Sequence, residues 1–166
     1  MRATLTIFLA AVPTEIAAQD TGGNQPEGPV QPIPFSHKTH VSNRVACKDC
    51  HTNPAPGEAM LIPNADRCMV CHSAVKKDSP AIQKVAEYQS RKEPIPWKRV
   101  YTLPDFVDFS HKTHLESGKA TCEDCHGQVS ELTVMRKLKP ANMAFCVDCH
   151  RTNQAPNTCK SCHDEQ

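Results

Sequence analysis

The stretch Phe35-Ser-His-Lys-Thr-His-Val-Ser-Asn-Arg-Val-Ala-Cys-Lys-Asp-Cys-His51 ends in the pattern C-x-x-C-H. All ten cysteines of the 166-residue chain fall into five copies of this pattern. The five copies are Cys47–Cys50–His51, Cys68–Cys71–His72, Cys122–Cys125–His126, Cys146–Cys149–His150 and Cys159–Cys162–His163. One short pattern therefore accounts for every thiol in the sequence.

C-x-x-C-H is the attachment signature of c-type haem. The two thiols add across the two vinyl groups of the porphyrin, and the adjacent histidine binds the iron as the proximal ligand. The sequence thus predicts five covalently attached haems c. The ten cysteines are the predicted attachment residues, and His51, His72, His126, His150 and His163 are the predicted proximal ligands.

Other uses of paired cysteines do not explain the histidine. A zinc ribbon needs two C-x-x-C units per metal and no following histidine, and five units would leave one unpaired. A thioredoxin-like motif normally occurs once, near a βαβ pattern that this sequence lacks. A disulfide scaffold would not require the histidine either. Five haems remain the prediction.

A second set of histidines lies in a repeated hexapeptide. Phe35-Ser-His-Lys-Thr-His40 recurs unchanged as Phe109-Ser-His-Lys-Thr-His114. Cys47 follows His40 by seven residues, and Cys122 follows His114 by eight. The chain is therefore interpreted as a duplicated module with one extra haem motif at its C-terminal end.

The second axial ligands of the haem irons are expected from this repeat, because imidazole is the commonest metal-binding side chain. His37 and His111 are predicted to serve the haem of the motif that follows each of them. His40 and His114 are predicted to reach other haems of their own modules.

Four such histidines cannot serve five irons. The fifth iron takes methionine, another group, water or a histidine of another chain, and methionine would raise its potential above those of its neighbours. Met143, three residues before Cys146, and Met60, ahead of Cys68, are the candidates. An open fifth iron would instead permit ligand binding or catalysis.

Composition supports a haem-filled interior. Aromatic residues make up 5% of the chain, and it contains 14 prolines. Small chains with weak apolar cores usually depend on cofactors, metals or disulfides. No stretch alternates apolar and polar residues over several positions, as a β-strand would. The predicted fold is therefore mostly irregular, with short α-helices around the porphyrins. A formal net charge of +1 gives no support for nucleic-acid binding.

The sequence predicts five consecutive segments. Residues 1–18 are interpreted as an export signal with an apolar run at Leu5–Val12, too short to span a bilayer, and residues 19–32 as a flexible leader. A dihaem module is expected at 33–79, a helical connector at 80–103 and a trihaem module at 104–166. Ser79 and Pro80 predict the N-cap and first residue of the connector helix, which should end before Pro94.

These motifs resemble known multihaem cytochromes. The F-x-H-x-x-H element ahead of C-x-x-C-H resembles that of the class III cytochromes c, whose paired histidines are ligands to two haems. The segment Pro96-Trp-Lys-Arg-Val-Tyr-Thr-Leu-Pro-Asp-Phe-Val-Asp-Phe-Ser-His111, with Cys122–Gly127 and Met143–Arg151, resembles the pentahaem subunit of alternative complex III. In that family a methionine just ahead of the fourth motif matches Met143.

The resemblance implies a function. It predicts periplasmic electron transfer, either within a membrane-bound quinol-oxidising complex or as a soluble shuttle, with redox proteins as partners and no membrane span in the mature chain. Subunits of that family commonly have a membrane-spanning N-terminus, whereas this chain offers only Leu5–Val12. Two alternatives remain: a small multihaem reductase with one open iron, and a polymerising extracellular conduit.

Overall fold

The computed structural model describes residues 28–163. The expected export signal at 1–18 lies outside the described residues. So do most of the expected leader, at 19–27, and the last three residues of the chain.

The described residues form short helices joined by irregular segments, with no strand among them. The α-helices are α1 (His37–Ser42), α2 (Cys47–Cys50), α3 (Ala65–His72), α4 (Pro80–Arg91), α5 (Cys122–His126) and α6 (Met143–Thr152). A π-helix, η1 (Thr113–Ser117), and two 3₁₀-helices, η2 (Val129–Glu131) and η3 (Cys159–Ser161), complete the set. The predicted fold class is confirmed.

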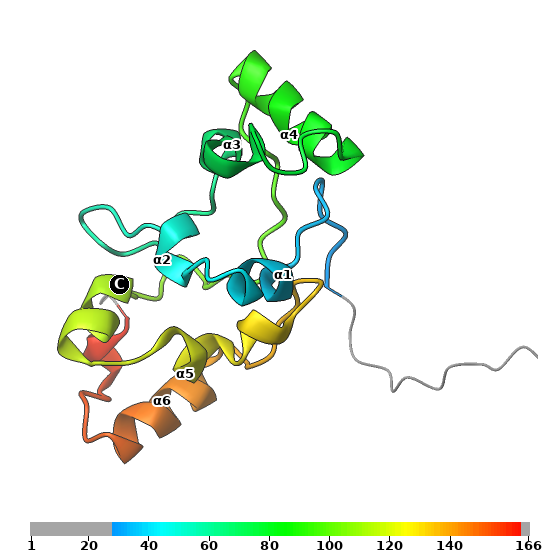
Figure 1. Cartoon of the computed structure of the whole chain (residues 1–166). Coiled ribbons are helices and arrows are strands. Elements are labelled where there is room, and N and C mark those ends of the chain that lie inside the picture. The colour runs from blue at the N-terminus through cyan, green and yellow to red at the C-terminus, as the bar shows by residue number, and fades with distance from the viewer. Residues whose placement is uncertain (1–27, 164–166) are drawn as a thin grey trace, which may run out of the picture.

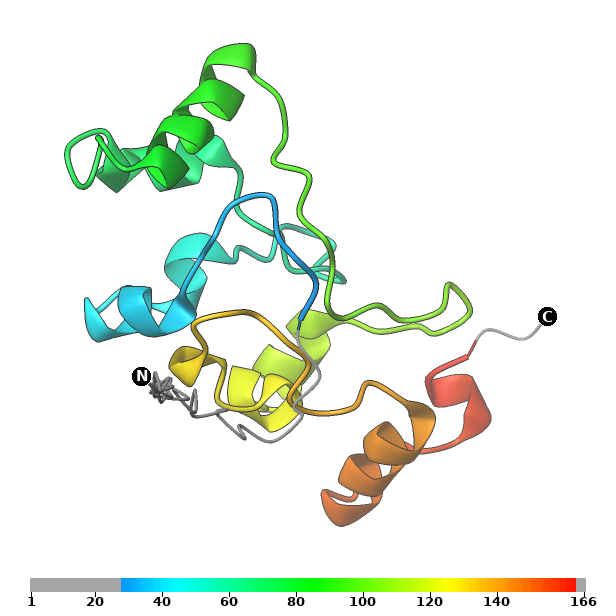
Figure 2. The same ribbon diagram turned by 90° about the vertical axis from the view of Figure 1, so that its right-hand side faces the viewer.

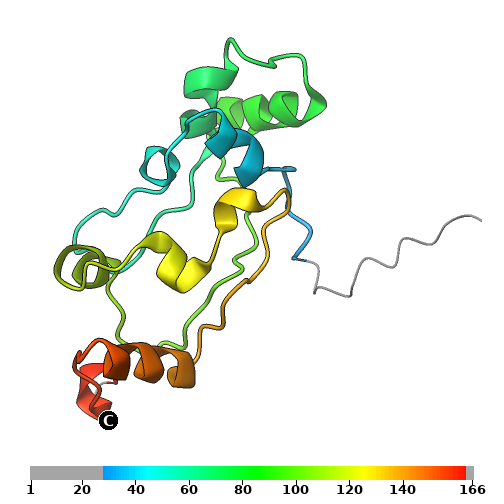
Figure 3. The same ribbon diagram turned by 60° about the horizontal axis from the view of Figure 1, so that its bottom comes forward.

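The helices succeed one another from one end of the molecule to the other. Helices α3 and α4 lie together at one end of the molecule, and α6 with the C-terminal segment lies at the other (Figure 1). Helices α1, α2 and α5 lie between these ends. The same order is visible after rotation about either axis (Figures 2 and 3).

Helix α4 begins and ends as its sequence predicts. Ser79 is the N-cap with extended backbone, Pro80 is the first helical residue, and Lys92 ends the helix in the left-handed conformation at φ 53°. Proline fits this first position because its missing N–H would have no partner inside the helix. The helix prediction for the connector is confirmed.

A small apolar cluster joins α4 to α3. Val85 of α4 packs with Ala65 of α3 and with Ile33 and Ile95 from the flanking segments. Trp97 packs against the same cluster, and its indole N–H donates to the Pro63 carbonyl at 2.9 Å. This cluster holds together the end of the molecule that carries the second haem motif.

The rest of the interior has few buried side chains. Besides the cluster, Leu132 is the one further buried hydrophobic residue in the described part of the chain. Large apolar side chains such as Val70 and Met143 are about 70% exposed. With five buried hydrophobic residues in the described part of the chain, the polypeptide by itself provides only a small core.

The duplicated hexapeptide folds into the same local structure twice. In the first copy the Phe35 ring stacks on His40 at 4.3 Å, and in the second Phe109 stacks on His114 at 4.5 Å. The same phenylalanine rings also stand edge-on to the first histidine of each copy, at interplanar angles of 85° and 89°. The repeat in sequence is therefore a repeat in structure.

One inserted residue distinguishes the two copies. The Val45 N–H donates to the His40 carbonyl, whereas the matching bond in the second copy runs from Ala120 to His114, over one residue more. The chain accommodates this residue in the π-helix η1, where the first copy has the α-helix α1. Single π-turns inside helices commonly arise in this way and often lie at functional sites.

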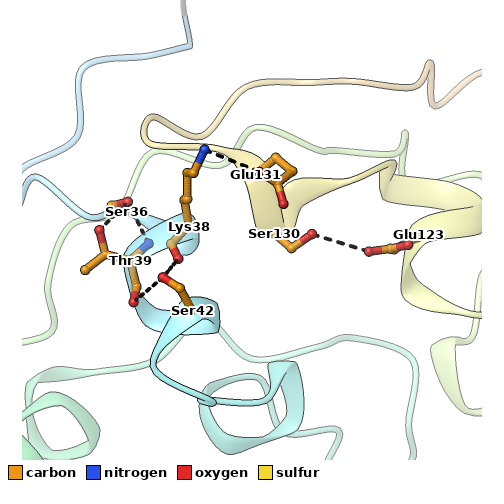
Figure 4. Close-up of polar contacts among 7 residues, drawn as sticks. All are labelled: Ser36, Lys38, Thr39, Ser42, Glu123, Ser130 and Glu131. Atoms are coloured by element: carbon orange, nitrogen blue, oxygen red, sulfur yellow. Dashed lines mark hydrogen bonds and ion pairs between the residues drawn. The ribbon is translucent and has the colours of Figure 1, made fainter.

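Each copy is held by a segment of the other module. The Lys38 N–H of α1 donates to the Leu132 carbonyl at 3.0 Å, and the Lys38 ammonium lies 3.4 Å from the Glu131 carboxylate (Figure 4). In the other direction, the Lys112 N–H donates to the Gly57 carbonyl at 2.9 Å. The two modules therefore dock reciprocally.

Candidate functional site

The first and third motif helices start in the same way. The Asp49 carboxylate accepts the Ala46 N–H at 2.8 Å, and Asp124 accepts the Thr121 N–H at 2.7 Å. The Thr121 hydroxyl and N–H both hold the exposed Asp124 carboxylate and lower its pKa. An acidic side chain in the first turn satisfies free N–H groups and favours the helix dipole.

Asparagine starts the other two α-helical motifs. The Asn64 side chain accepts the Arg67 N–H at 3.2 Å at the start of α3, and Asn142 accepts the Phe145 N–H at 3.0 Å at the start of α6. These caps fix the short helices that carry the second and fourth motifs.

The ten cysteine thiols are free, and none is fully buried. Burial still raises the pKa of four of them, Cys68, Cys122, Cys125 and Cys146, because a thiolate loses hydration there. The thiols thus lie at the edge of the polypeptide, where a large planar group can reach them.

Two pairs of imidazole rings face each other in parallel. The ring centres of His37 and His51 lie 6.4 Å apart, with planes 10° from parallel. His111 and His126, at the equivalent positions of the second module, lie 6.5 Å apart at 8°. In each pair, one histidine comes from the hexapeptide and the other from the motif that follows it.

Two further pairs join the second histidine of each hexapeptide to the next motif along the chain. The His40 and His72 ring centres lie 6.1 Å apart with planes at 68°. Those of His114 and His150 lie 5.9 Å apart at 52°. One short helical segment therefore serves two motifs in each module.

These separations fit one metal ion between each pair of rings. Two imidazole nitrogens on opposite sides of a metal, each about 2 Å from it, place the ring centres about 6 Å apart. All four separations lie between 5.9 and 6.5 Å. With a C-x-x-C beside each motif histidine, the donor set fits a six-coordinate haem iron.

Backbone carbonyls orient most of these rings through Nδ1. His40 and His114 bond in this way to the carbonyls of Ser36 and Ser110, each at 2.8 Å. The other Nδ1 contacts are His51 with Leu61, His72 with Val75, His111 with Glu58, His150 with Pro156 and His163 with Phe106. Such a bond fixes the tautomer and leaves Nε2 free to bind a metal.

His37 differs because its Nδ1 is buried with no hydrogen-bond partner among the described residues. Burial, followed by the neighbouring His51 and His40, lowers the pKa of His37 to about 4. Burial, followed by His111 and His51, also lowers the pKa of His126. Both rings are thus kept in the neutral form that a metal requires.

The fifth motif lacks a facing imidazole among the described residues. His163 lies beside the Phe106 ring at 5.8 Å, and its Nδ1 contacts the Phe106 carbonyl at 3.0 Å. The Asp108 N–H donates to the Cys162 carbonyl at 2.9 Å, which fastens the motif to the segment before the second hexapeptide.

The two candidate methionines lie in different places. Met143 is the first residue of α6 and is 70% exposed. It lies one helical turn before Cys146, whose thiol neighbours that of Cys162 in the fifth motif. Met60 lines a cavity together with His51 of the first motif. Met143 is therefore the candidate on the side of the fifth motif.

The motifs also have a definite order of neighbours. Cys50 is near Cys68 and helps to raise the pKa of Cys68, and Cys47 is near Cys122 of the other module and helps to raise the pKa of Cys122. Cys125 has Cys149 and Cys146 as neighbours, and Cys146 has Cys162. Every motif therefore lies beside at least one other motif.

Sequence reasoning missed two contributors to the site. Tyr101 stands edge-on to His126 at 4.6 Å, and its hydroxyl accepts the N–H groups of Leu138 and Lys139. Glu58 contributes its backbone carbonyl to His111. Tyr101 lies inside a segment that the resemblance had marked, but a carbonyl leaves no trace in the residue type.

Two kinds of feature are absent from the described residues. No helix there is long and apolar enough to cross a bilayer. No group of three or more His, Cys, Asp or Glu side chains is placed there to hold a bare metal ion.

Comparisons with known proteins agree with this geometry. Residues 39–128, more than half of the chain, match the family model described as cytochrome c3. Residues 107–165 match the model described as cytochrome c7 and related cytochrome c. The two matches overlap and together run from the first hexapeptide almost to the C-terminus.

Two curated proteins are similar in sequence. The multihaem cytochrome c subunit of menaquinone reductase from Nitratidesulfovibrio vulgaris (strain Hildenborough) is 39% identical over 103 residues, 61% of this chain. The match spans about half (47%) of that protein's length. Cytochrome c3 of Desulfuromonas acetoxidans is 36% identical over 58 residues, which is 34% of this chain and 79% of that protein.

Proposed function

Because this chain belongs to the cytochrome c3 family and is a multihaem cytochrome c that transfers electrons, we propose that each of its five C-x-x-C-H motifs attaches one haem. Haem c, when bound, supplies a one-electron Fe(III)/Fe(II) couple. The four facing imidazole pairs are the observation that carries the proposal.

Intact-mass spectrometry of the purified protein tests the number of haems. The expected mass is that of the processed polypeptide plus five haems. A variant with Cys159→Ala and Cys162→Ala should lose one haem and keep four. A wild-type mass with four haems or fewer would contradict the proposal.

The proposed axial ligands follow from the facing pairs. The first haem is bound by His51 and His37, and the second by His72 and His40. In the second module, His126 and His111 bind the third haem, and His150 and His114 bind the fourth. The nearly parallel planes of the first and third pairs, against the tilted planes of the second and fourth, divide the four irons into two geometric classes.

The fifth haem is proposed to be bound by His163 and Met143. Met143 begins α6 one turn before Cys146, next to Cys162, and its exposed thioether has room to turn toward a bound group. Met60 lines the cavity beside His51, an imidazole that already faces His37. The described geometry therefore favours Met143 over Met60.

Paired substitutions test this ligand. Met143→Leu should abolish the weak near-infrared band of a methionine-bound ferric haem and lower the potential of one haem, because thioether ligation raises the potential. Met60→Leu is the matched control and should leave both unchanged. A wild-type protein that binds carbon monoxide at one haem would instead favour the open iron, and with it the reductase alternative.

The proposed setting is a quinone-linked membrane complex outside the cytoplasm. The similar protein is named for menaquinone reduction, the reverse of the quinol oxidation expected from the sequence. A menaquinone reductase subunit is among the similar proteins, and its matched segment covers 61% of this chain. Redox partner proteins would bind at the surface, and the periplasm is the proposed compartment because c-type haem is attached there in bacteria. A soluble shuttle is the second form of the same electron-transfer function.

A native gel of solubilised membranes and of the periplasmic fraction, stained for haem, distinguishes the two forms. A band in a large membrane complex is expected. A stained band only near the mass of the chain with its haems would contradict membership of a complex and leave the shuttle.

A further inference from the structure

We infer that the five attachment sites form one row in the order second, first, third, fourth, fifth, so that spatial order and sequence order differ at the first two sites. The inference rests on the proposed function, because it requires a haem at every motif. It goes beyond that function by fixing which sites exchange electrons directly and which two sites end the row.

The first two sites are neighbours within the first module. His37 and His40 lie three residues apart on α1 and face the first and second motifs. The thiols of Cys50 and Cys68 are also close, since Cys50 is the main influence on the pKa of Cys68 after burial. The second site is carried by α3, which packs on α4 at one end of the molecule (Figure 1).

The first site, not the second, meets the other module. The Cys122 thiol of the third motif has Cys47 as its neighbour, and the His126 ring has His51 as a neighbour. Within the described residues, the ring that faces His72 and the thiol beside Cys68 both belong to the first module.

A cavity of about 410 Å³ lies at this junction. Its lining combines Lys48 and His51 of the first module with Lys112 and Leu115 of the second. The hydrogen bond from the Lys112 N–H to the Gly57 carbonyl joins the two modules at the same place. The modules are therefore joined where the first and third sites face each other.

The remaining sites continue the row away from that junction. His111 and His114, three residues apart, face the third and fourth motifs at ring separations of 6.5 and 5.9 Å. The Cys125 thiol has Cys149 of the fourth motif as a neighbour, and Cys146 has Cys162 of the fifth. Helices α3, α2, α5 and α6 succeed one another along the molecule in all three views (Figures 1, 2 and 3). The motif at the C-terminal end completes the row beside α6.

Electron balance in this row is simple. With haems attached, neighbouring sites would exchange one electron at a time, so that one iron would go from Fe(II) to Fe(III) as the next went from Fe(III) to Fe(II), with no proton or atom transferred. The second and fifth sites are the ends, and they exchange electrons with external one-electron redox partners. Exchange between the modules passes through the first and third sites.

His111→Met, at the third site, tests the order. Methionine ligation raises the potential of that haem, so it is reduced together with the fifth haem and ahead of the three remaining bis-histidine haems when reductant is added in small steps. Its added charge then shifts the haem-methyl NMR signals of its neighbours. The inferred row predicts shifts at the first and fourth haems and none at the second. A row in sequence order predicts shifts at the second and fourth, which would overturn the inference.

His40→Met, at the second site, is an independent variant in the other module. Compared with the wild type, the inferred row predicts a new shift at the first haem alone, whereas sequence order predicts new shifts at the first and third. Each variant is first checked for five haems by mass and for the loss of one bis-histidine signal. If the parent protein has five haems but a variant loses no bis-histidine signal, the ligand assignment is wrong and the inferred row is wrong as well. If it succeeds, the NMR shifts decide the order alone.

Discussion

The Nδ1 atom of His111 lies 2.8 Å from the backbone carbonyl oxygen of Glu58, a residue 53 positions earlier in the chain. The contact crosses the boundary between the two modules. It fixes the ring of a proposed ligand of the third haem from a loop that follows the first motif. Because an Nδ1 bond selects the tautomer and orientation of a metal-binding histidine, the first module helps to build the third site.

Gly57→Ala tests this dependence. Gly57 has φ +96°, and an added Cβ would lie 2.5 Å from the Lys112 Cβ, so the loop must move away from the second hexapeptide. The expected cost is about 1–3 kcal/mol of unfolding free energy. We also expect a change in the ligand-field spectrum of one bis-histidine haem, measured by electron paramagnetic resonance.

Glu58→Ala is the matched control for that variant. The exposed Glu58 side chain is removed, but the carbonyl that faces His111 stays. Its spectrum should therefore be that of the wild type. A spectral change in the control as large as that in Gly57→Ala would assign the effect to the side chain and contradict the account.

The site was largely predictable because its cysteines and histidines lie in short motifs with fixed spacing. C-x-x-C-H and the repeated hexapeptide identified the histidines that the structure brings face to face. The proline and serine at the start of α4 likewise determined that helix through local backbone preference. The ligand roles of these residues, and of Met143, remain predictions.

The cross-module contacts were not predictable from sequence. Glu58 acts through a carbonyl that every residue type has, and Gly57 acts through its lack of a Cβ. The junction of the first and third sites depends on tertiary docking between segments far apart in the chain. Local pattern carries no information about such docking.

A deletion tests whether the π-helix η1 only accommodates the extra residue of the second copy. Removing Ser117 shortens η1 and gives the second copy the seven-residue spacing from histidine to cysteine that the first copy has. We expect all five haems and four bis-histidine signals to remain, because α1 shows that this spacing positions both histidines.

The comparison variant deletes Asn43 from the first copy, which leaves a spacing that neither copy has. We expect it to lose the ligation of one haem, visible as a new high-spin signal. Equal tolerance of both deletions would show that the spacing does not position the histidines.

The contact between α1 and η2 contains one exposed ion pair and one buried apolar side chain, so substitutions can compare their contributions to stability. Lys38 and Glu131 are about 60% exposed in their ion pair, so Lys38→Ala should change the unfolding free energy by less than about 1 kcal/mol. Leu132 is 4% exposed, and Leu132→Ala should cost about 2–5 kcal/mol. Denaturant unfolding of the holoprotein measures both, and the reverse ranking would contradict this account of the docking.

Tyr101 is expected to stabilise the surroundings of His126. Its hydroxyl accepts the Leu138 N–H at 3.1 Å and the Lys139 N–H at 3.4 Å, while its ring packs edge-on against His126. Tyr101→Phe should cost about 0.5–1.5 kcal/mol of unfolding free energy, because the two N–H groups exchange the hydroxyl for water.

The haem spectrum of that variant should stay unchanged, because the ring still packs on His126. Tyr101→Ala removes the ring and should also broaden the signal of one haem. A spectrum unchanged in both variants would show that Tyr101 has no influence on His126.

We expect four haems with two histidine ligands each and one haem with a histidine and a methionine ligand. Near-infrared magnetic circular dichroism of the fully oxidised protein, normalised to haem content, separates these ligand pairs in one spectrum. The account predicts bis-histidine and histidine–methionine intensities in a ratio of four to one. Fewer than four bis-histidine haems would contradict it, because one of the facing imidazole pairs would then not bind an iron.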